Sequence, residues 1–577
     1  MIKLLRFVKP YAWAAAMVVL LVLGQVFADL NLPNLLSRMI DVGIAQADRG
    51  VIWQTGLAML GLTVLSMACA IFTSYFASRI GAGLGRDLRR ALFTQVETFS
   101  LAEFDDFGTS SLITRTTNDV MQVQGFMVMF LRVVLMAPLM CVGGLVMALG
   151  KNARLATLIV AAMPVLVLLV VLVSRRAIPL FQSMQGKLDR LNRVTRENLT
   201  GMRVIRAFIT EQHEKERFQQ ASRDLMDTTV RVQRMMALLM PAMMILLNGL
   251  SITLVAVGGG RIQAGAMATG DLIAMIQYLM QIMMALIMMS MIFVMMPRAQ
   301  VSANRINAVL DREPSIQDPA QAETGSGLKG YVRFDHVSFR YPGAEEDVLH
   351  DISFEAKPGQ TTAFIGSTGS GKSTLINLVP RFYDVTGGSV KVDGVDVRQM
   401  SQHELRDKIG YVPQKGVLFS GTIASNIGYG LEQPEARRLE QAAEVAQASE
   451  FIARKDKGME EPIAQGGTNV SGGQRQRLAI ARAVAKDPEI YIFDDSFSAL
   501  DFKTDAALRA RLKQQTGQAT VLIVGQRVSS IMDADTIVVL DEGRVAGMGT
   551  HRQLLDSCPV YREIAASQLS EEELSCK

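Results

Sequence analysis

The chain has 577 residues, of which 49% are hydrophobic, and its formal net charge at pH 7 is +4. This length exceeds that of one ordinary domain, and so small a net charge on so long a chain does not indicate nucleic-acid binding. The four cysteines lack the spacing of a zinc site or of a disulfide framework, so the sequence does not indicate a small disulfide-rich or zinc-bound fold. They are Cys69, Cys141, Cys558 and Cys576.

Nearly all of the long hydrophobic runs lie in the first 310 residues. A membrane-spanning helix needs roughly 20 apolar residues, and lipid leaves no partner for open backbone polar groups, so such runs form helices. Six segments qualify, centred on residues 12–28, 56–77, 127–150, 155–173, 237–258 and 272–295. The sequence therefore predicts an all-α, six-helix transmembrane domain over residues 1–310.

Two long polar stretches, residues 78–124 and 174–234, separate the second span from the third and the fourth from the fifth. Both are rich in Arg and Lys, so we expect them and the N-terminus to face the cytosol. Their apolar residues recur at helical spacing, which predicts long helical extensions rather than solvated loops. Lys151 and Arg154 are exceptions to the enrichment of Lys and Arg in cytosolic loops, because they lie in a short connection on the predicted outer side.

Methionine is abundant, with 34 residues, and is densest between Met275 and Met296. Flexible thioethers suit a cavity that repacks around varied apolar ligands, although lipid-facing or gap-filling side chains would give the same pattern. Asn248, Gln277 and Gln281 are candidate cavity or interhelix groups within the spans. Asp29 and Arg132 are ionisable residues in or near spans, so each is either functional or placed at a membrane boundary.

Residues 311–330 contain two prolines and several Gly and Ser residues, which predicts a linker. Residues 331–577 have the mixed composition of a soluble α/β domain. Within it, residues 366–373 match the phosphate-loop pattern G-x-x-x-x-G-K-[ST]. A strand-like run precedes the match and an apolar helical pattern follows it, as this motif requires; a Gly/Ser-rich turn without a ligand is the alternative.

Glycines at these spacings let backbone N–H groups turn towards phosphates, and the following helix points its positive end at the same anion. We expect Lys372 to reach the outer phosphates of ATP and the Ser373 hydroxyl to ligate Mg²⁺. The predicted nucleotide-binding residues of this loop are Gly366, Ser367, Thr368, Gly369, Ser370, Gly371, Lys372, Ser373 and Thr374.

Further motifs follow in chain order. Tyr341 offers a ring for stacking on adenine, and Gln414 ends a strand-like run from which it can reach Mg²⁺. Asp494 ends an apolar strand-like run, which suits holding Mg²⁺ through water. Asp501 follows it closely. Ser471, Gly472, Gly473 and Gln474 open a helix whose N-terminus suits an anion.

With these motifs in this order, the chain resembles a half-transporter of the ABC exporters, of the type IV, multidrug-resistance-like class. The resemblance implies a six-helix membrane domain followed by a RecA-like α/β nucleotide-binding domain with a helical subdomain. It also implies roles for Tyr341 as the A-loop, Gln414 as the Q-loop and Asp501 as the D-loop. In that family two ATP molecules lie between paired domains, each held by one subunit's phosphate loop and the other's Ser-Gly-Gly-Gln signature. Segments near residues 104–114 and 197–206 would be the coupling helices.

Two residues depart from the family pattern. The position after the Mg²⁺-binding aspartate usually holds a glutamate that polarises water, whereas here it is Asp495. Its carboxylate lies roughly 1–1.5 Å further back, and a misplacement of about 1 Å can cost on the order of 100-fold in rate. The family's switch histidine is replaced by Gln526, which cannot become a cation near neutral pH. A single conservative substitution could be neutral drift, which is the alternative. Two substitutions beside the same phosphate instead predict a site that binds ATP and hydrolyses it slowly.

The intact signature would serve a partner's ATP, so we expect a heterodimer with a second half-transporter; a homodimer with two slow sites is the alternative. The predicted function is ATP-driven export of amphipathic or drug-like compounds by a multi-pass protein of the cell membrane. A lipid or lipopeptide translocase is the alternative. An ATP-gated channel or regulatory subunit is disfavoured because the spans lack rings of like charge.

Overall fold

The computed structural model describes residues 1–325 and 327–569. The side chains at positions 170, 174, 239, 290, 291, 293 and 294 lie outside this description, as does Cys576. The chain forms two compact units. The first comprises Met1–Glu97 and Ser110–Arg312, and the second comprises Thr98–Thr109 and the chain from Glu313 onward.

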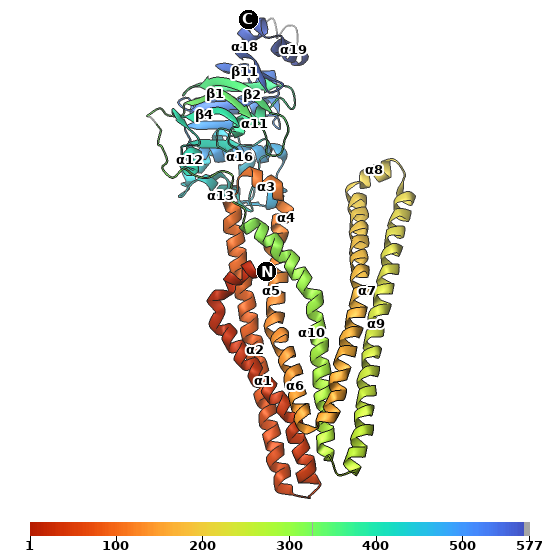
Figure 1. Cartoon of the computed structure of the whole chain (residues 1–577). Coiled ribbons are helices and arrows are strands. Elements are labelled where there is room, and N and C mark those ends of the chain that lie inside the picture. The colour runs from red at the N-terminus through yellow and green to blue at the C-terminus, as the bar shows by residue number, and fades with distance from the viewer. Residues whose placement is uncertain (326, 570–577) are drawn as a thin grey trace. The chain divides into compact units, whose positions relative to one another are not determined.

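The first unit is helical throughout (Figure 1). Six of its helical stretches are long and apolar enough to cross a membrane, as predicted. The helical elements of this unit are η1 (Ile2–Tyr11), α1 (Ala12–Arg38), η2 (Met39–Ile44), α2 (Arg49–Glu97), α4 (Thr109–Thr114), η3 (Arg115–Asp119), α5 (Val120–Met129), η4 (Phe130–Val134), α6 (Leu135–Lys151), α7 (Ala153–Thr200), α8 (Met202–Ala207), α9 (Glu211–Gln263) and α10 (Thr269–Leu310). Here η1 is a 3₁₀-helix, and η2, η3 and η4 are π-helical turns.

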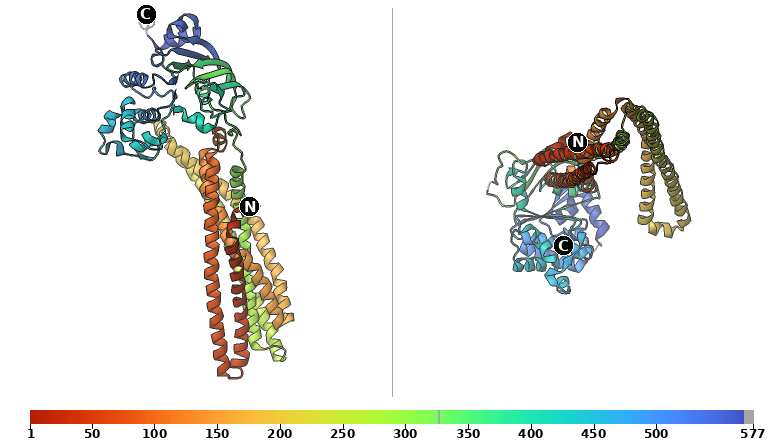
Figure 2. Two further views of the ribbon diagram at one scale, coloured as in Figure 1. Left: turned by 90° about the vertical axis from the view of Figure 1, so that its left-hand side faces the viewer. Right: turned by 90° about the horizontal axis from the view of Figure 1, so that it is seen from below.

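The charged stretches between spans are helical rather than looped, which confirms the prediction from their periodicity. α2 continues without a break to Glu97, and α7 and α9 form a long hairpin with the short helix α8 at its tip (Figures 1 and 2). On α2 the side chains of Ile80, Leu84, Leu88 and Leu92 are all buried. Their four-residue spacing puts them on one helix face, so the extension of α2 buries one apolar stripe.

A polar cluster joins three helices where α6 ends and α10 begins. Lys151 Nζ lies 2.8 Å from Asp271 Oδ1, and the Ser37 hydroxyl donates to the same oxygen at 2.8 Å. The Gly270 N–H donates to Asp41 Oδ1 at 2.7 Å. This pairing explains how a lysine is accommodated on the side where Lys and Arg are less frequent, because its charge is neutralised locally.

The second unit contains two larger sheets and a two-stranded one. The four-stranded antiparallel sheet has the order β2-β1-β4-β5, and the six-stranded sheet has the order β12-β11-β3-β10-β9-β6. The strands are β1 (Val332–Phe339), β2 (Leu349–Ala356), β3 (Thr361–Gly366), β4 (Gly387–Val392), β5 (Val395–Asp396), β6 (Ile409–Val412), β7 (Gly421–Thr422), β8 (Pro462–Ile463), β9 (Ile490–Asp494), β10 (Thr520–Val524), β11 (Thr536–Asp541) and β12 (Arg544–Gly549).

Helices pack around the six-stranded sheet, and α13 to α16 also pack against one another. The helices of this unit are α3 (Leu101–Phe107), α11 (Lys372–Asn377), α12 (Gln402–Asp407), α13 (Ile423–Ile427), α14 (Ala436–Val445), α15 (Ser449–Ala453), α16 (Gly472–Lys486), α17 (Phe502–Gln515), α18 (His551–Ser557) and α19 (Pro559–Gln568), with short 3₁₀ turns η5 (Gly428–Gly430), η6 (Gly458–Glu460), η7 (Gln465–Gly467) and η8 (Val528–Ser530).

Both faces of the six-stranded sheet are buried, which is why its central strands read as unbroken apolar runs. On β9, Tyr491 and Phe493 pack in the core on one face, while Ile490 and Ile492 pack in the core on the other. Strands β3, β10, β9 and β6 are adjacent and parallel. Their carboxyl ends therefore meet along one edge, where open α/β sheets bind ligands.

We expect the Asp271→Asn variant to lower the melting temperature, because it leaves the half-buried Lys151 ammonium uncompensated. The two side chains are 26% and 21% exposed, so the loss should lie between that of surface and buried pairs, at about 1–2 kcal/mol. Thermal unfolding in lipid nanodiscs measures the effect. The double variant with Lys151→Met should recover part of it. Asp224→Asn, which breaks the more exposed pair with Arg190, is the control; an equal loss there would contradict the assignment.

Candidate active site

The phosphate loop adopts a backbone that only glycine accommodates. Gly369 and Gly371 have φ values of +88° and +92°, in the left-handed region. A Cβ atom on Gly371 would lie 2.6 Å from Leu349 Cδ2, whereas one on Gly369 would meet no described atom within 4 Å. The loop thus closes tightly against the protein on one side and leaves room for a ligand on the other, as a phosphate cradle requires.

The Lys372 ammonium folds back onto the loop that it follows. Its Nζ donates to the carbonyl oxygens of Gly366 at 2.9 Å and Ser367 at 2.6 Å. Burial lowers the pKa of Lys372, while the charges of Asp495 and Asp494 oppose that shift. A phosphate group would offer this half-buried cation an anionic partner in place of neutral carbonyls, and charge-assisted hydrogen bonds are the stronger ones.

Ser373 and Asp494 provide oxygen ligands that fit Mg²⁺. The Ser373 hydroxyl donates to Asp494 Oδ1 at 2.9 Å, and burial raises the pKa of Asp494. Among the described residues there is no cluster of three or more His, Cys, Asp or Glu side chains that could hold a metal ion. Magnesium commonly binds through one or two carboxylates plus substrate phosphates. The pair therefore suits an ion that arrives with the nucleotide, and its Mg²⁺ role remains a prediction.

Asp495 is the most constrained residue of the site. It is buried, and its φ of +45° is unusual for a residue other than glycine. Its Oδ2 accepts hydrogen bonds from Gln526 Nε2 at 2.8 Å and Gln414 Nε2 at 3.2 Å. Burial raises the pKa of Asp495, and the bond from Gln414 opposes that shift. One carboxylate oxygen is thus held between two amide groups.

Most of these groups line one cavity of about 250 Å³ beside the phosphate loop, whereas Gly366, Ser367, Ser370 and Asp494 are not part of its lining. The structure therefore brings together residues that lie up to 178 positions apart (348 to 526) in the sequence. Sequence analysis missed the apolar walls, Val348 and Val524. The cavity is lined by Val348, Thr368, Gly369, Gly371, Lys372, Ser373, Thr374, Gln414, Asp495, Val524 and Gln526.

Tyr341 lies next to the loop. Its hydroxyl is 2.9 Å from Thr374 Oγ1, and its ring packs edge-on against Phe339 and Tyr383 at centroid distances of 4.9 and 5.2 Å. It lines a neighbouring pocket of about 590 Å³ rather than the phosphate cavity itself. That position, one hydrogen bond from the loop, fits a base attached to bound phosphates. The adenine role remains a prediction.

The signature residues and Asp501 do not line the phosphate cavity. Ser471 caps α16 reciprocally with Gln474, through a Gln474 N–H to Ser471 Oγ bond of 3.3 Å and a Ser471 N–H to Gln474 Oε1 bond of 3.0 Å. Asp501 caps α17 by accepting the Thr504 N–H at 3.0 Å. Each therefore has a local capping role within this chain, and the nucleotide roles of these residues remain predictions.

A short helix from the membrane half of the sequence packs within the nucleotide unit. In α3, Asp105 accepts the Tyr383 hydroxyl at 3.1 Å, and Glu103 accepts the Ser315 N–H at 3.2 Å. Burial would raise the pKa of Glu103, but hydrogen bonds from Ser100 and Ser315 outweigh it and hold the pKa low. The S-x-x-E capping box formed by Ser100 and Glu103 was the available sequence signal for this helix.

Comparison with known proteins gives one family. Residues 15–286 match the family model described as the ABC transporter transmembrane region, and residues 349–498 match the family model described as ABC transporter. An uncharacterized ABC transporter ATP-binding protein of Mycobacterium tuberculosis is 44% identical, with 97% of each chain covered. An ATP-dependent lipid A-core flippase of Aromatoleum aromaticum is 32% identical, covering 99% of this chain and 96% of the flippase.

Among solved structures, a bacterial Atm1-family ABC exporter with ATP bound matches with a TM-score of 0.81 and 26% identity over 99% of both chains. The six apolar helices and these relatives identify a multi-pass membrane protein whose nucleotide-binding domain lies in the cytosol. The predicted fold class, exporter activity, ATPase activity and location are thereby confirmed.

We expect Tyr341→Ala to weaken ATP binding by roughly 5- to 150-fold, because stacking on a base contributes about 1–3 kcal/mol. Tyr341→Phe keeps the ring and loses only the bond to Thr374, so it should change affinity little. Titration with a fluorescent ATP analogue, repeated with the triphosphate lacking its base, separates the two effects. If Tyr341→Phe and Tyr341→Ala weaken ATP binding equally, the ring of Tyr341 does not hold the adenine.

Proposed function

Since this chain belongs to the ABC exporters, we propose that it is the slow-site subunit of a two-subunit, ATP-driven exporter of amphipathic compounds. Its own phosphate loop binds Mg²⁺-ATP and hydrolyses it slowly. Its Ser-Gly-Gly-Gln signature completes the ATP site of a second half-transporter, which performs most of the hydrolysis.

The observation that carries this proposal is the hydrogen bonding of Asp495. A general base must reach the attacking water, but one oxygen of this short carboxylate accepts from Gln526 at 2.8 Å and from Gln414 at 3.2 Å. Gln526 donates a neutral hydrogen bond, so it adds no positive charge beside a developing phosphate charge. Gln526 and Asp495, the two residues that would accelerate hydrolysis, are hydrogen-bonded to each other, which supports slow hydrolysis in the proposal.

Two features support a second subunit. The signature residues lie outside this chain's own phosphate cavity, so they have no nucleotide to act on within it. The tip of the α7–α9 hairpin also exposes apolar side chains at and beside α8, among them Val204, Phe208 and Ile209, which are 60%, 75% and 84% exposed. Apolar patches of this kind mark interaction sites, and a nucleotide-binding domain of the partner would cover them.

Lipid translocation is the second candidate. Relatives covering nearly the whole chain are named ATP-dependent lipid A-core flippases, at 32% and 30% identity. A lipid and an amphipathic drug share an apolar body and a polar end, so the same membrane cavity can serve both. Transport of a fluorescent phospholipid and of a fluorescent cationic drug into proteoliposomes, measured side by side, separates the two candidates.

The chain purified alone should show little ATPase activity, and activity should appear when it is co-purified with a sister half-transporter, for example the product of a neighbouring reading frame. In that complex, Asp495→Asn should reduce turnover much less than Glu→Gln at the equivalent partner position. Brisk hydrolysis by this chain alone, or equal losses from both substitutions, would contradict the asymmetry.

We expect the double variant Asp495→Glu with Gln526→His to raise the ATPase activity of the chain alone by about tenfold or more. The added methylene extends the carboxylate towards the water, and a positioned general base contributes roughly 100- to 10,000-fold. Lys372→Ala in the same background is the control, because it removes the phosphate contact and should abolish any gained rate. An unchanged rate with intact nucleotide binding would show that these two residues do not limit hydrolysis.

A further inference from the structure

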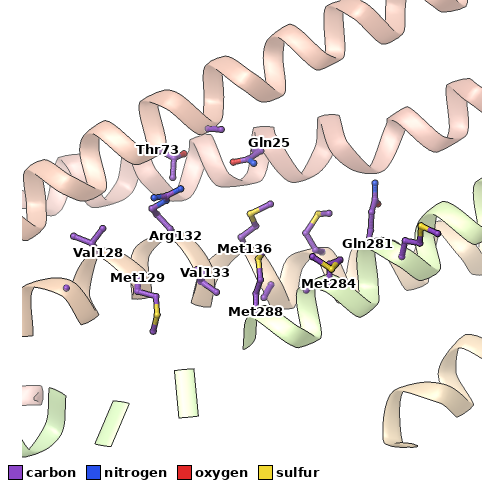
Figure 3. A pocket seen from close by; sticks show the side chains of 16 residues that line it. Gln25, Thr73, Val128, Met129, Arg132, Val133, Met136, Gln281, Met284 and Met288 are labelled. Carbon is purple, nitrogen blue, oxygen red and sulfur yellow. The ribbon is translucent and has the colours of Figure 1, made fainter. Parts of the chain in front are cut away.

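The first unit holds a cavity of about 740 Å³ bounded by α1, α2, α5, η4, α6 and α10 (Figure 3). This volume lies within the range of drug-sized ligand sites. Its lining is largely apolar and includes six methionines, Met129, Met136, Met140, Met280, Met284 and Met288. The thioether side chains are flexible and polarizable, so they can adapt to an irregular apolar chain.

The methionines of α10 divide into two faces. Met275 and Met283 are fully buried in the packing of the unit. Met280, Met284 and Met288 follow one another at four-residue spacing and line the cavity instead. Because residues four apart share a helix face, these three form one stripe that is not used to hold the fold together.

A single cation, Arg132, lies in this apolar surface. Within the described part of the chain its guanidinium has no hydrogen bond or ion pair, and the residues lining the cavity include no carboxylate. An ionisable side chain at membrane depth is costly and normally has a partner or a function. Arg132 is placed in the π-helical turn η4, one turn from the cavity residues Met129 and Met136.

A second polar group without a partner faces the same space. Thr73 is 4% exposed, and among the described residues its Oγ1 atom has no hydrogen-bond partner. Leaving a buried hydroxyl unpaired costs free energy. Figure 3 shows Thr73 on α2 and Arg132 on η4 directed towards one another across the cavity. The cavity thus presents two free hydrogen-bond donors facing one another and a lining rich in thioethers, which also contains Gln25 and Gln281. The Gln281 Oε1 atom likewise has no hydrogen-bond partner among the described residues.

We propose that this cavity binds an amphiphile with one anionic headgroup, a carboxylate or a phosphate, and a flexible apolar chain. The headgroup pairs with Arg132 and accepts from the Thr73 hydroxyl, and the chain lies along the methionine stripe of α10. Guanidinium pairs with carboxylate and phosphate by the same bidentate hydrogen bonding, so both headgroups are covered. This inference rests on the proposed export of amphipathic compounds and adds the sign of their charge.

Binding is measured on the full chain with its partner subunit in nanodiscs of zwitterionic lipid. Three fluorescent probes share one alkyl chain and differ only in the headgroup, which is carboxylate, phosphate or trimethylammonium. We expect both anionic probes to bind about tenfold or more tightly than the cationic one, since hydrogen bonds to charged groups are worth at least that factor. Tighter binding of phosphate would identify lipid-like cargo, and tighter binding of carboxylate would identify acidic drug-like cargo.

Arg132→Gln should abolish the preference for anionic probes and leave the affinity for the cationic probe unchanged or higher. Arg132→Lys should keep much of the preference for anionic probes. Met284→Ala with Met288→Ala should weaken all three probes alike. Arg154→Gln is the matched control, because Arg154 is an exposed arginine of α7 that does not line the cavity. Melting curves of each variant exclude unfolding as the cause.

Equal affinities for anionic and cationic probes, or unchanged anion affinity in Arg132→Gln, would overturn the inference. The binding assay contains no ATP, so it does not depend on hydrolysis or transport. Selective anion binding without transport would refute the export proposal alone. Transport of amphiphiles without regard to headgroup would refute only the assignment of Arg132.

Discussion

The order of four adjacent parallel strands, β3, β10, β9 and β6, is the constraint on which the nucleotide site depends. Neighbouring strands lie about 4.8 Å apart, so the residues that follow them are fixed within reach of one another. The phosphate loop follows β3, Gln526 follows β10, Asp495 follows β9 and Gln414 follows β6. Backbone hydrogen bonds between the strands fix these positions. Side chains at the carboxyl ends of the strands can therefore be substituted without disturbing the sheet.

That separation between fold and chemistry explains how binding and hydrolysis can diverge in one site. Asp494 and Asp495 place two carboxylates beside Lys372, and the charge of Arg527 also acts on Asp495. A protonated histidine at position 526 would add a further cation, whereas glutamine adds none. In the proposed function, Mg²⁺ would balance the charge of the anionic triphosphate, and position 526 would add no cation as the terminal phosphate is cleaved.

Features written in contiguous sequence were predictable, and features that join distant segments were not. Apolar runs identified the spans, and the phosphate loop is a single stretch of eight residues, 366–373. The hydrogen bond from Gln526 to Asp495 was not predictable, because it depends on β10 lying beside β9. The pairing of Lys151 with Asp271 likewise joins segments 120 positions apart (151 to 271).

Arg132 illustrates a different limit. The π-helical turn η4 inserts an extra residue into the helical repeat. A regular 3.6-residue period continued through this segment therefore assigns the later side chains to the wrong helix face. From sequence alone, Arg132 could be either a residue at the membrane boundary or a functional residue. Placement in the cavity wall required the three-dimensional path of the helix. The methionines of α10 were similarly ambiguous, because one helix supplies both a packed face and a cavity face.

α10 also links the cavity to the end of the membrane unit. Its 42 residues span about 63 Å at the rise of an α-helix, from the methionine stripe to the residues that precede the linker. Pro297 interrupts the helical hydrogen bonding between these two ends. Beyond the proline, Arg115 donates to the Arg305 carbonyl at 3.0 Å and Gln95 donates to the Arg312 carbonyl at 2.8 Å. The position without a backbone N–H donor thus lies between the cavity face of α10 and its tethered far end.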